Sequence, residues 1–224
     1  MKNNLTKLMS ITMITVLMIS CKKEDTTIDT TNNGSFKVYT VGNITTVQNL
    51  IGDTILGISP TTFQPYGSGK FTFFNLATGQ LVAKTDSASN KWDLAFRGTT
   101  ILINNGTSGP GLGGAYINVG LFADVSKVSP DSTFRVDNAP TYAITTGSNK
   151  GWYVYDGISN LINPIPGRVL MIRTATGKYA KVEILNYYKG GVTPAASASD
   201  AVKTSEQRYY TFRYTYQASG STTF

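Results

Sequence analysis

Histidine is absent from the 224 residues, and cysteine occurs only once, at position 21. Without an imidazole the chain cannot build a Ser-His-Asp triad, the usual zinc sites or the commonest ligation of haem iron. A single Cys forms no intrachain disulfide, so the fold depends on none in any redox compartment. Glutamate is also scarce, whereas Thr, Tyr, Val and Gly are abundant. This balance favours strands and turns over helices.

The length and the aromatic content indicate one domain, or at most two small ones, with a sizeable buried core. The chain contains 13 Tyr, 10 Phe and 2 Trp residues, whose rings bury large apolar areas. The formal charge of +7 falls by two, to +5, without Lys2 and Lys7. The other basic residues are scattered and form no stripe. We therefore expect this charge to favour solubility, and we expect no nucleic-acid partner.

The amino-terminal segment combines two Lys residues with an apolar run at residues 8–19 and leads to Cys21. The run is too short to cross a bilayer comfortably and has the length of a signal peptide. It resembles a bacterial lipoprotein signal, in which the Cys after a small residue is lipidated and becomes the mature amino terminus. We predict a signal peptide over residues 1–20 and lipidation of Cys21. The alternative is a free Cys after an uncleaved anchor helix.

Residues 21–34 are polar and lack an apolar period, which predicts a flexible tether. Within them, residues 23–25 (KED) resemble the short charged signals that send Bacteroidetes lipoproteins to the cell surface. An ordinary solvated linker is the alternative interpretation. No other segment of the sequence is a candidate membrane span. We expect a protein held at the outer membrane through its lipid alone, on the cell surface.

Residues 35–224 are predicted to form a single all-β domain of many short antiparallel strands with little helix. One clear hairpin joins residues 70–76 to residues 81–84, and another joins residues 168–174 to residues 178–188. Both turns contain Gly, which tolerates a positive φ. The first arm of the second hairpin is apolar on both faces, so we expect it to be covered on both sides.

The carboxyl-terminal third contains one more strand signal and two segments without any. Residues 208–217 place Tyr210, Phe212, Tyr214 and Tyr216 on one face of a strand. Residues 156–167 carry two prolines and are expected to be irregular. Residues 190–207 are small and polar, which predicts a surface loop.

Residues 91–115 begin as a strand in which Trp92, Leu94 and Phe96 alternate with Asp93, Ala95 and Arg97. An apolar run at residues 100–103 follows, and then a loop with five glycines. The loop lacks the Lys-Ser/Thr ending of a phosphate cradle, and no amphipathic helix follows it. We therefore interpret it as a structural loop whose backbone path side chains would obstruct.

Candidate catalytic groups are weak. Asp93 and Arg97 share a strand face and could form a partly buried ion pair or be solvated; catalysis is the least favoured interpretation. Ser108 lies outside any nucleophile elbow, and no His exists to activate it. The acidic residues are dispersed, so no carboxylate pair is indicated. We predict that the protein is not an enzyme.

Candidate binding groups are aromatic. Trp152 and Tyr155, beside a segment that ends at Pro164, could form a pocket wall for a planar apolar ligand, or an ordinary sheet core. Met171 carries a thioether, which can ligate haem iron. It lies in the middle of an apolar strand, however, where Met usually fills a core.

Four blocks of the sequence resemble the HmuY-like lipoprotein family of Bacteroidetes. They are WDLAFRG with GTSGPGLGGA, GWYxY at residues 151–155, RVLMIRTATGKYAKVEILNYYKG at residues 168–190, and YTFRYTY at residues 210–216. The similarity runs from about residue 71 to residue 216. It implies an all-β, surface-exposed lipoprotein that binds haem in a pocket and passes it to a TonB-dependent outer-membrane receptor.

The resemblance also implies two axial iron ligands, His in some members and Met in others. One would lie between the aromatic strand and the following Pro, where this chain has Ser159 and Asn160. The other would lie in residues 131–144, which contain Tyr142. Haem is thus the implied cofactor, but the chain offers no imidazole for it. The ligand-binding candidates are Tyr142, Trp152, Tyr155 and Asn160, and the weak metal candidates are Tyr142, Tyr155 and Met171.

Three hypotheses remain open at this point. The protein binds haem through unusual donors or by apolar sandwiching; it binds a metal-free porphyrin or another apolar ligand; or it uses the scaffold to bind a protein partner. A shared scaffold alone does not choose between them.

Overall fold

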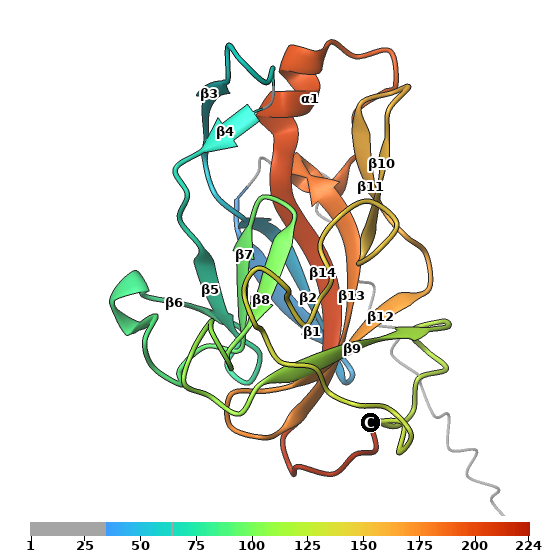
Figure 1. Ribbon diagram of the computed structural model, residues 1–224. Coiled ribbons are helices and arrows are strands. Elements are labelled where there is room, and N and C mark those ends of the chain that lie inside the picture. Colours follow the sequence, from blue (N-terminus) through green and yellow to red (C-terminus); the bar gives the residue numbers. More distant parts are fainter. Residues whose placement is uncertain (1–34, 64) are drawn as a thin grey trace, which may run out of the picture. The chain divides into compact units, whose positions relative to one another are not determined.

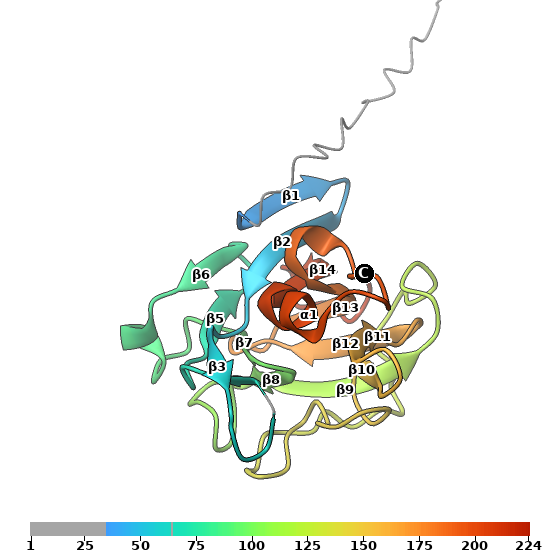
Figure 2. The same ribbon diagram turned by 90° about the horizontal axis from the view of Figure 1, so that it is seen from above.

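The computed structural model describes residues 35–63 and 65–224, which form four antiparallel sheets (Figure 1). The predicted signal peptide, Cys21 and the tether lie outside these residues, and the division of the chain into these segments stays a prediction. The largest sheet has six strands, which Figure 2 shows with β1 and β9 at opposite edges. In spatial order these are β1 (Lys37–Val41), β2 (Ile44–Ile51), β14 (Gln207–Gln217), β13 (Tyr179–Tyr188), β12 (Arg168–Arg173) and β9 (Gly114–Val119).

The second sheet has four strands, and two separate hairpins complete the strand content of the described residues. The four strands are β6 (Gln80–Val82), β5 (Thr72–Asn75), β7 (Leu94–Arg97) and β8 (Thr100–Ile103). The hairpins are β3 (Ile55–Ile58) with β4 (Pro65–Gly67), and β10 (Tyr153–Asp156) with β11 (Leu161–Pro164). Helix α1 (Asp200–Glu206) and two 3-10 turns (Lys84–Asp86 and Lys189–Gly191) are short. The expected all-β class is confirmed.

The main core lies between the six-stranded and four-stranded sheets and is rich in aromatic rings. Phe212 of β14 stacks on Phe96 of β7 with centroids 5.5 Å apart, and Phe74 of β5 meets Phe212 edge-on at 5.5 Å. Tyr210 and Tyr214 belong to the same buried cluster. The predicted apolar face of the last strand is therefore confirmed, and its burial is a major source of fold stability.

Both predicted hairpins are present. Phe74 pairs with Leu81 between β5 and β6, and Leu170 pairs with Val182 between β12 and β13. Strand β12 is covered on both sides, because Leu170 faces the main core while Met171 faces a smaller cluster around Phe122. This expectation is also confirmed.

The expected pattern of residues 91–97 is wrong in one respect. Trp92 precedes β7 and packs with Phe73, Ala95 and Leu102 in a small second cluster, whereas Phe96 lies in the main core. The two rings thus face opposite sides of the four-stranded sheet. Strict alternation fails because regular strand geometry begins only at Leu94. Strand β7 is covered on both faces, not half-buried.

Two further expectations are corrected. Residues 156–167 were expected to be irregular, but they contain β11, in which Pro164 pairs with Tyr153 and Leu161 pairs with Asp156. Only the residues around β11 form turns. The predicted surface loop at residues 190–207 contains α1, which begins after Ser199, whose side chain accepts a hydrogen bond from the N–H of Val202. Such a cap favours helix initiation. Figure 1 shows α1, β3–β4 and β10–β11 at the same end of the sheets.

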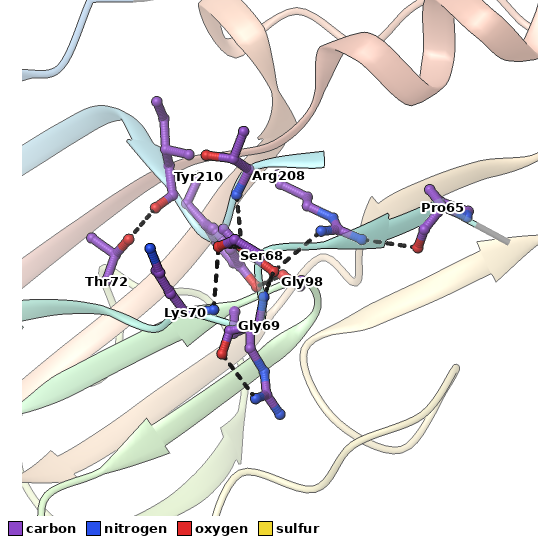
Figure 3. A network of polar contacts seen from close by, with 12 residues as sticks. Pro65, Ser68, Gly69, Lys70, Thr72, Gly98, Arg208 and Tyr210 are labelled. Atoms are coloured by element: carbon purple, nitrogen blue, oxygen red, sulfur yellow. Dashed lines mark hydrogen bonds and ion pairs between the residues drawn. The ribbon is translucent and has the colours of Figure 1, made fainter. Parts of the chain in front are cut away.

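A buried ion pair joins the β3–β4 hairpin to β14. The guanidinium of Arg208 lies 3.5 Å from the carboxylate of Asp53. It also donates a hydrogen bond to the carbonyl oxygen of Pro65 at 3.1 Å, which Figure 3 shows. Both charged residues have a positive φ, 84° for Asp53 and 73° for Arg208. A positive φ is unfavourable for most residues other than Gly. We infer that the ion pair and its hydrogen bonds hold Asp53 and Arg208 in this conformation.

The surroundings of Asp53 favour its ionised form. Burial acts to raise the pKa of this carboxyl. Hydrogen bonds from Ser68, Gly69 and Thr54, together with the charge of Arg208, outweigh that effect and hold the pKa below its ordinary value.

We predict that Asp53→Asn lowers the free energy of unfolding by about 3 kcal/mol at pH 7, because it leaves Arg208 buried without its counter-charge. The lowered pKa means that the carboxylate contributes stability above the unfolded-state value of 3.8, and that this contribution disappears as pH falls through the folded-state value. Urea unfolding at pH 7 and near pH 3 should show the difference between wild type and variant shrinking in acid.

Asp86→Asn is the matched control. Its partner Lys91 lies 2.9 Å away, but the Lys side chain is 63% exposed. Such a surface pair contributes less than about 1 kcal/mol. An equal loss in both variants would contradict a special role for the buried pair.

Candidate functional site

A groove of about 650 Å³ opens beside the four-stranded sheet and the glycine-rich loop. Its apolar lining comes mainly from Phe71, Phe73, Leu102 and Tyr142. The loop residues 106–110 form another wall, and Ser87, Ala88 and Ala139 complete the rim. This volume lies within the range of small-molecule sites, which is roughly 300–1,000 Å³. The groove is larger than a second concavity of about 260 Å³ beside Val38 and Tyr214.

The glycine-rich loop is held by the buried side chain of Asn104. Its Oδ1 accepts from the N–H of Gly111 at 2.9 Å, and its Nδ2 donates to the carbonyl oxygens of Ser89 and Trp92 at 2.9 and 2.7 Å. A side chain at Gly109 would collide with Asn104 and with the Trp92 ring. The glycines therefore let the loop pack against Trp92, which agrees with a structural role. The same loop also walls the groove.

Asp137 connects the loop to the opposite side of the groove. This residue is 1% exposed, and its carboxylate accepts from the N–H groups of Ile103 at 3.0 Å and Ala143 at 2.8 Å. Its own carbonyl oxygen accepts from the N–H of Thr107 at 2.9 Å. Burial raises the pKa of Asp137, although hydrogen bonds from Ala143, Ser108 and Ile103 oppose that rise.

Tyr142 is the one predicted ligand-binding residue that lines the groove. Its side chain is partly buried and packs against the small cluster of Phe73, Trp92 and Leu102. Its carbonyl oxygen accepts a hydrogen bond from the guanidinium of Arg135 at 3.2 Å. Sequence reasoning identified Tyr142 through the resemblance alone and did not identify the Phe residues that lie beside it.

Trp152 lies in the main core and does not line the groove. It is 1% exposed, and its Nε1 donates to the carbonyl oxygen of Thr99 at 2.9 Å. Its ring contacts Tyr153, Tyr187 and Tyr210 at centroid distances of 5.0, 5.6 and 5.3 Å. Of the two alternatives, a pocket wall or an ordinary sheet core, Trp152 therefore fits the sheet core.

Tyr155 and Asn160 come together at the β10–β11 hairpin. The phenol of Tyr155 is hydrogen-bonded to Oδ1 of Asn160 at 2.6 Å, and Nδ2 of Asn160 donates to Asp200 at 3.1 Å. Tyr155 is 45% exposed, whereas the neighbouring Ser159 is 8% exposed. The structure thus joins two of the predicted residues to each other and to α1, but neither lines the groove.

Met171 is fully buried in the cluster with Phe122, Val125 and Val169. A ligand could reach its sulfur only by displacing that packing. Over residues 35–63 and 65–224, no group of three or more His, Cys, Asp or Glu side chains is arranged to hold a metal ion. No helix in this described part is long and apolar enough to cross a membrane.

Asp93 and Arg97 do not act as a pair. Asp93 is buried and accepts from the backbone N–H groups of Leu76 and Ala175, at 2.8 and 2.9 Å. The guanidinium of Arg97 lies over the ring of Phe71, 4.3 Å from its centroid. Both residues therefore support packing. Of the two alternatives considered, the ion pair is wrong, and solvation is wrong for Asp93, which is buried.

We predict that Asp137→Asn lowers the free energy of unfolding by about 2 kcal/mol. A neutral amide offers one oxygen for the two N–H groups of Ile103 and Ala143, so one buried donor loses its acceptor. Urea unfolding and faster hydrogen exchange at those two amides measure the effect. Asp131→Asn, an exposed change in the same segment, is the control. Equal exchange rates in the two variants would contradict the role of Asp137.

Comparison with solved structures gives partial likenesses. A candidate lipoprotein of Bacteroides fragilis NCTC 9343 is 18% identical, with 80% of this chain and 93% of that chain covered and a TM-score of 0.49. A candidate HmuY-like haem-binding protein of Bacteroides vulgatus ATCC 8482 is 15% identical, with coverages of 77% and 91% and a TM-score of 0.47. The apo HmuY analogue of Tannerella forsythia is 14% identical, with coverages of 82% and 97% and a TM-score of 0.41.

A family model gives the decisive comparison. No curated protein matches the chain. The model described as HmuY protein matches residues 68–214, which is more than half of the sequence. These bounds contain nearly all of the region that the sequence blocks indicated, so the predicted resemblance is confirmed. The chain belongs to the HmuY protein family.

Proposed function

We propose that the protein is a lipid-anchored surface lipoprotein that captures haem or a related porphyrin and passes it to a TonB-dependent outer-membrane receptor. Membership of the HmuY family over residues 68–214 is the observation that carries this proposal. The name of the Bacteroides vulgatus relative describes haem binding for that protein. In this proposal the β sheets form a rigid frame that presents a preformed binding surface.

The proposed role is binding, not catalysis. The buried carboxylates of Asp93 and Asp137 accept backbone hydrogen bonds, so neither is placed as an acid or base for a substrate. A groove lined by aromatic rings and by neutral hydroxyl groups instead favours retention of a small molecule.

The residues of the groove fit a porphyrin ring better than they fit its iron. Phe71, Phe73 and Tyr142 offer aromatic surface, and the phenol of Tyr142 is the only lining group of a kind known to ligate haem iron. The remaining lining hydroxyls come from Ser and Thr. When bound, haem would supply redox-active iron, while these side chains would bind the ring and exclude water.

The shortage of side chains that could ligate haem iron supports a second candidate function. The sequence contains no His, and Met171 is fully buried. These two facts favour the same scaffold binding a different apolar ligand or a protein partner without ligation of haem iron.

We predict that ferric haem added to the purified protein produces a saturable shift of the Soret band with one equivalent bound. The shift follows from moving the ring from water into an apolar groove. The titration is measured by absorbance with ferric and then ferrous haem. The same additions of haem to buffer without protein serve as the blank. If neither oxidation state nor the metal-free ring binds, capture of a tetrapyrrole is not the function.

We predict that Cys21→Ser abolishes membrane attachment, because the lipid at Cys21 would be the only anchor. Membrane fractionation and incorporation of labelled fatty acid measure the change, and protease treatment of intact cells tests surface exposure of the wild type. Ser20→Ala, which keeps a small residue before the Cys, is the control. Retention of the Cys21→Ser protein in membranes would instead support the uncleaved anchor helix.

A further inference from the structure

The floor of the groove is an apolar, mainly aromatic surface. Phe73 and Leu102 are 9% and 8% exposed, and Phe71 and Tyr142 are partly buried against them. The Trp92 ring supports this floor from below, meeting Phe73 edge-on with centroids 5.0 Å apart. Flat rings of this kind suit the face of a planar conjugated molecule.

The walls of the groove are fixed before any ligand arrives. The N–H of Thr107 donates to the carbonyl oxygen of Asp137, and the N–H of Ala139 donates to the hydroxyl of Thr107, both at 2.9 Å. These bonds connect the glycine-rich loop to the segment that carries Tyr142. A ligand therefore meets a preformed site, so little conformational entropy is lost on binding.

Two guanidinium groups contact the residues that form the floor. Arg97 lies over the ring of Phe71, with its carbon 4.3 Å from the centroid. Arg135 donates to the carbonyl oxygen of Tyr142 at 3.2 Å and to Thr145 at 3.1 Å. Among the described residues no charged side chain lines the groove itself. Both cations thus lie beside residues of the groove but outside its lining. A guanidinium has five donors with which to bind carboxylates.

No strong metal donor faces this surface. The lining polar side chains are the hydroxyls of Ser87, Thr107 and Ser108 and the phenol of Tyr142. Ring stacking and guanidinium–carboxylate pairing act on the organic part of a ligand whether or not a metal occupies its centre.

We propose that this groove binds a planar, conjugated, carboxylate-bearing tetrapyrrole through its ring and its acid groups, without a bond from the protein to a metal. The choice of a tetrapyrrole rests on the proposed function, and the site and the mode of binding go beyond it. The metal-free ring and its iron complex therefore bind with similar affinity. Tyr142 contributes its ring face, and its hydroxyl is dispensable.

The test titrates metal-free protoporphyrin and ferric haem against the wild-type protein and two tryptophan variants. Ala88 is exposed and lines the groove, so Ala88→Trp fills it without disturbing the core. Ala83 is also exposed but lies outside the lining, so Ala83→Trp is the matched control. We expect the dissociation constants of the two compounds to agree within about threefold for the wild type, and likewise for Ala83→Trp. Ala88→Trp should weaken both at least tenfold while keeping the wild-type melting temperature.

A pair of variants at Tyr142 tests the mode of binding. Tyr142→Phe keeps the ring and should leave both affinities and the Soret position of bound haem unchanged, whereas Tyr142→Ala should weaken both compounds. Loss of haem binding alone in Tyr142→Phe would overturn the proposal in favour of phenolate ligation. Haem binding that exceeds that of the metal-free ring a hundredfold would also overturn it.

The outcomes separate the site from the function. If both compounds bind and Ala88→Trp binds them as tightly as the wild type, the groove is not the site, although tetrapyrrole capture stands. If neither compound binds the wild type, the proposed function and this inference both fail.

Discussion

The carboxylate of Asp93 accepts hydrogen bonds from two backbone N–H groups that are far apart in the chain, those of Leu76 and Ala175. It thereby fixes the end of β5 and the turn between β12 and β13 beside the start of β7. Burial raises the pKa of Asp93, and the two hydrogen bonds oppose that rise. Replacing the carboxylate by an apolar group would leave both buried donors unsatisfied, which is costly. This one side chain thus adds a buried polar link between the two large sheets to the aromatic packing of the main core.

The groove inherits its shape from the same junction. The carbonyl oxygen of Asp93 accepts from the N–H of Asn104 at 3.3 Å, and Asn104 in turn holds Trp92 and the glycine-rich loop. Asp137 repeats the arrangement on the other side of the loop, where it also binds two backbone N–H groups. The hydrogen bonds that stabilise the fold are therefore the ones that shape the groove. A change that loosens them should weaken folding and binding together.

Local pattern was enough to predict the hairpins and the last strand, because alternation and a turn glycine act over a few residues. The local pattern was not enough to predict the role of Asp93, because its partner Ala175 is distant in sequence. The alternation alone suggested a solvated face or an ion pair with Arg97. The alternation also placed Trp92 with Phe96, although regular strand geometry starts only at Leu94. The groove escaped prediction for the same reason, since Phe73 and Tyr142 meet only after the sheet has formed.

Asn160, at the hairpin position where the resemblance implied an iron ligand, has a local structural role in this chain. The phenol of Tyr155 is bonded to Asn160, and Asn160 donates to Asp200 at the start of α1. Polar groups that satisfy one another in this way lose those hydrogen bonds if they turn toward a ligand. The ring of Tyr142, in contrast, is partly buried against Phe73 and Leu102 and lines the groove. If the groove holds a tetrapyrrole by its ring, as proposed, the ligand does not have to break the hydrogen bonds of the hairpin, and its binding needs no imidazole.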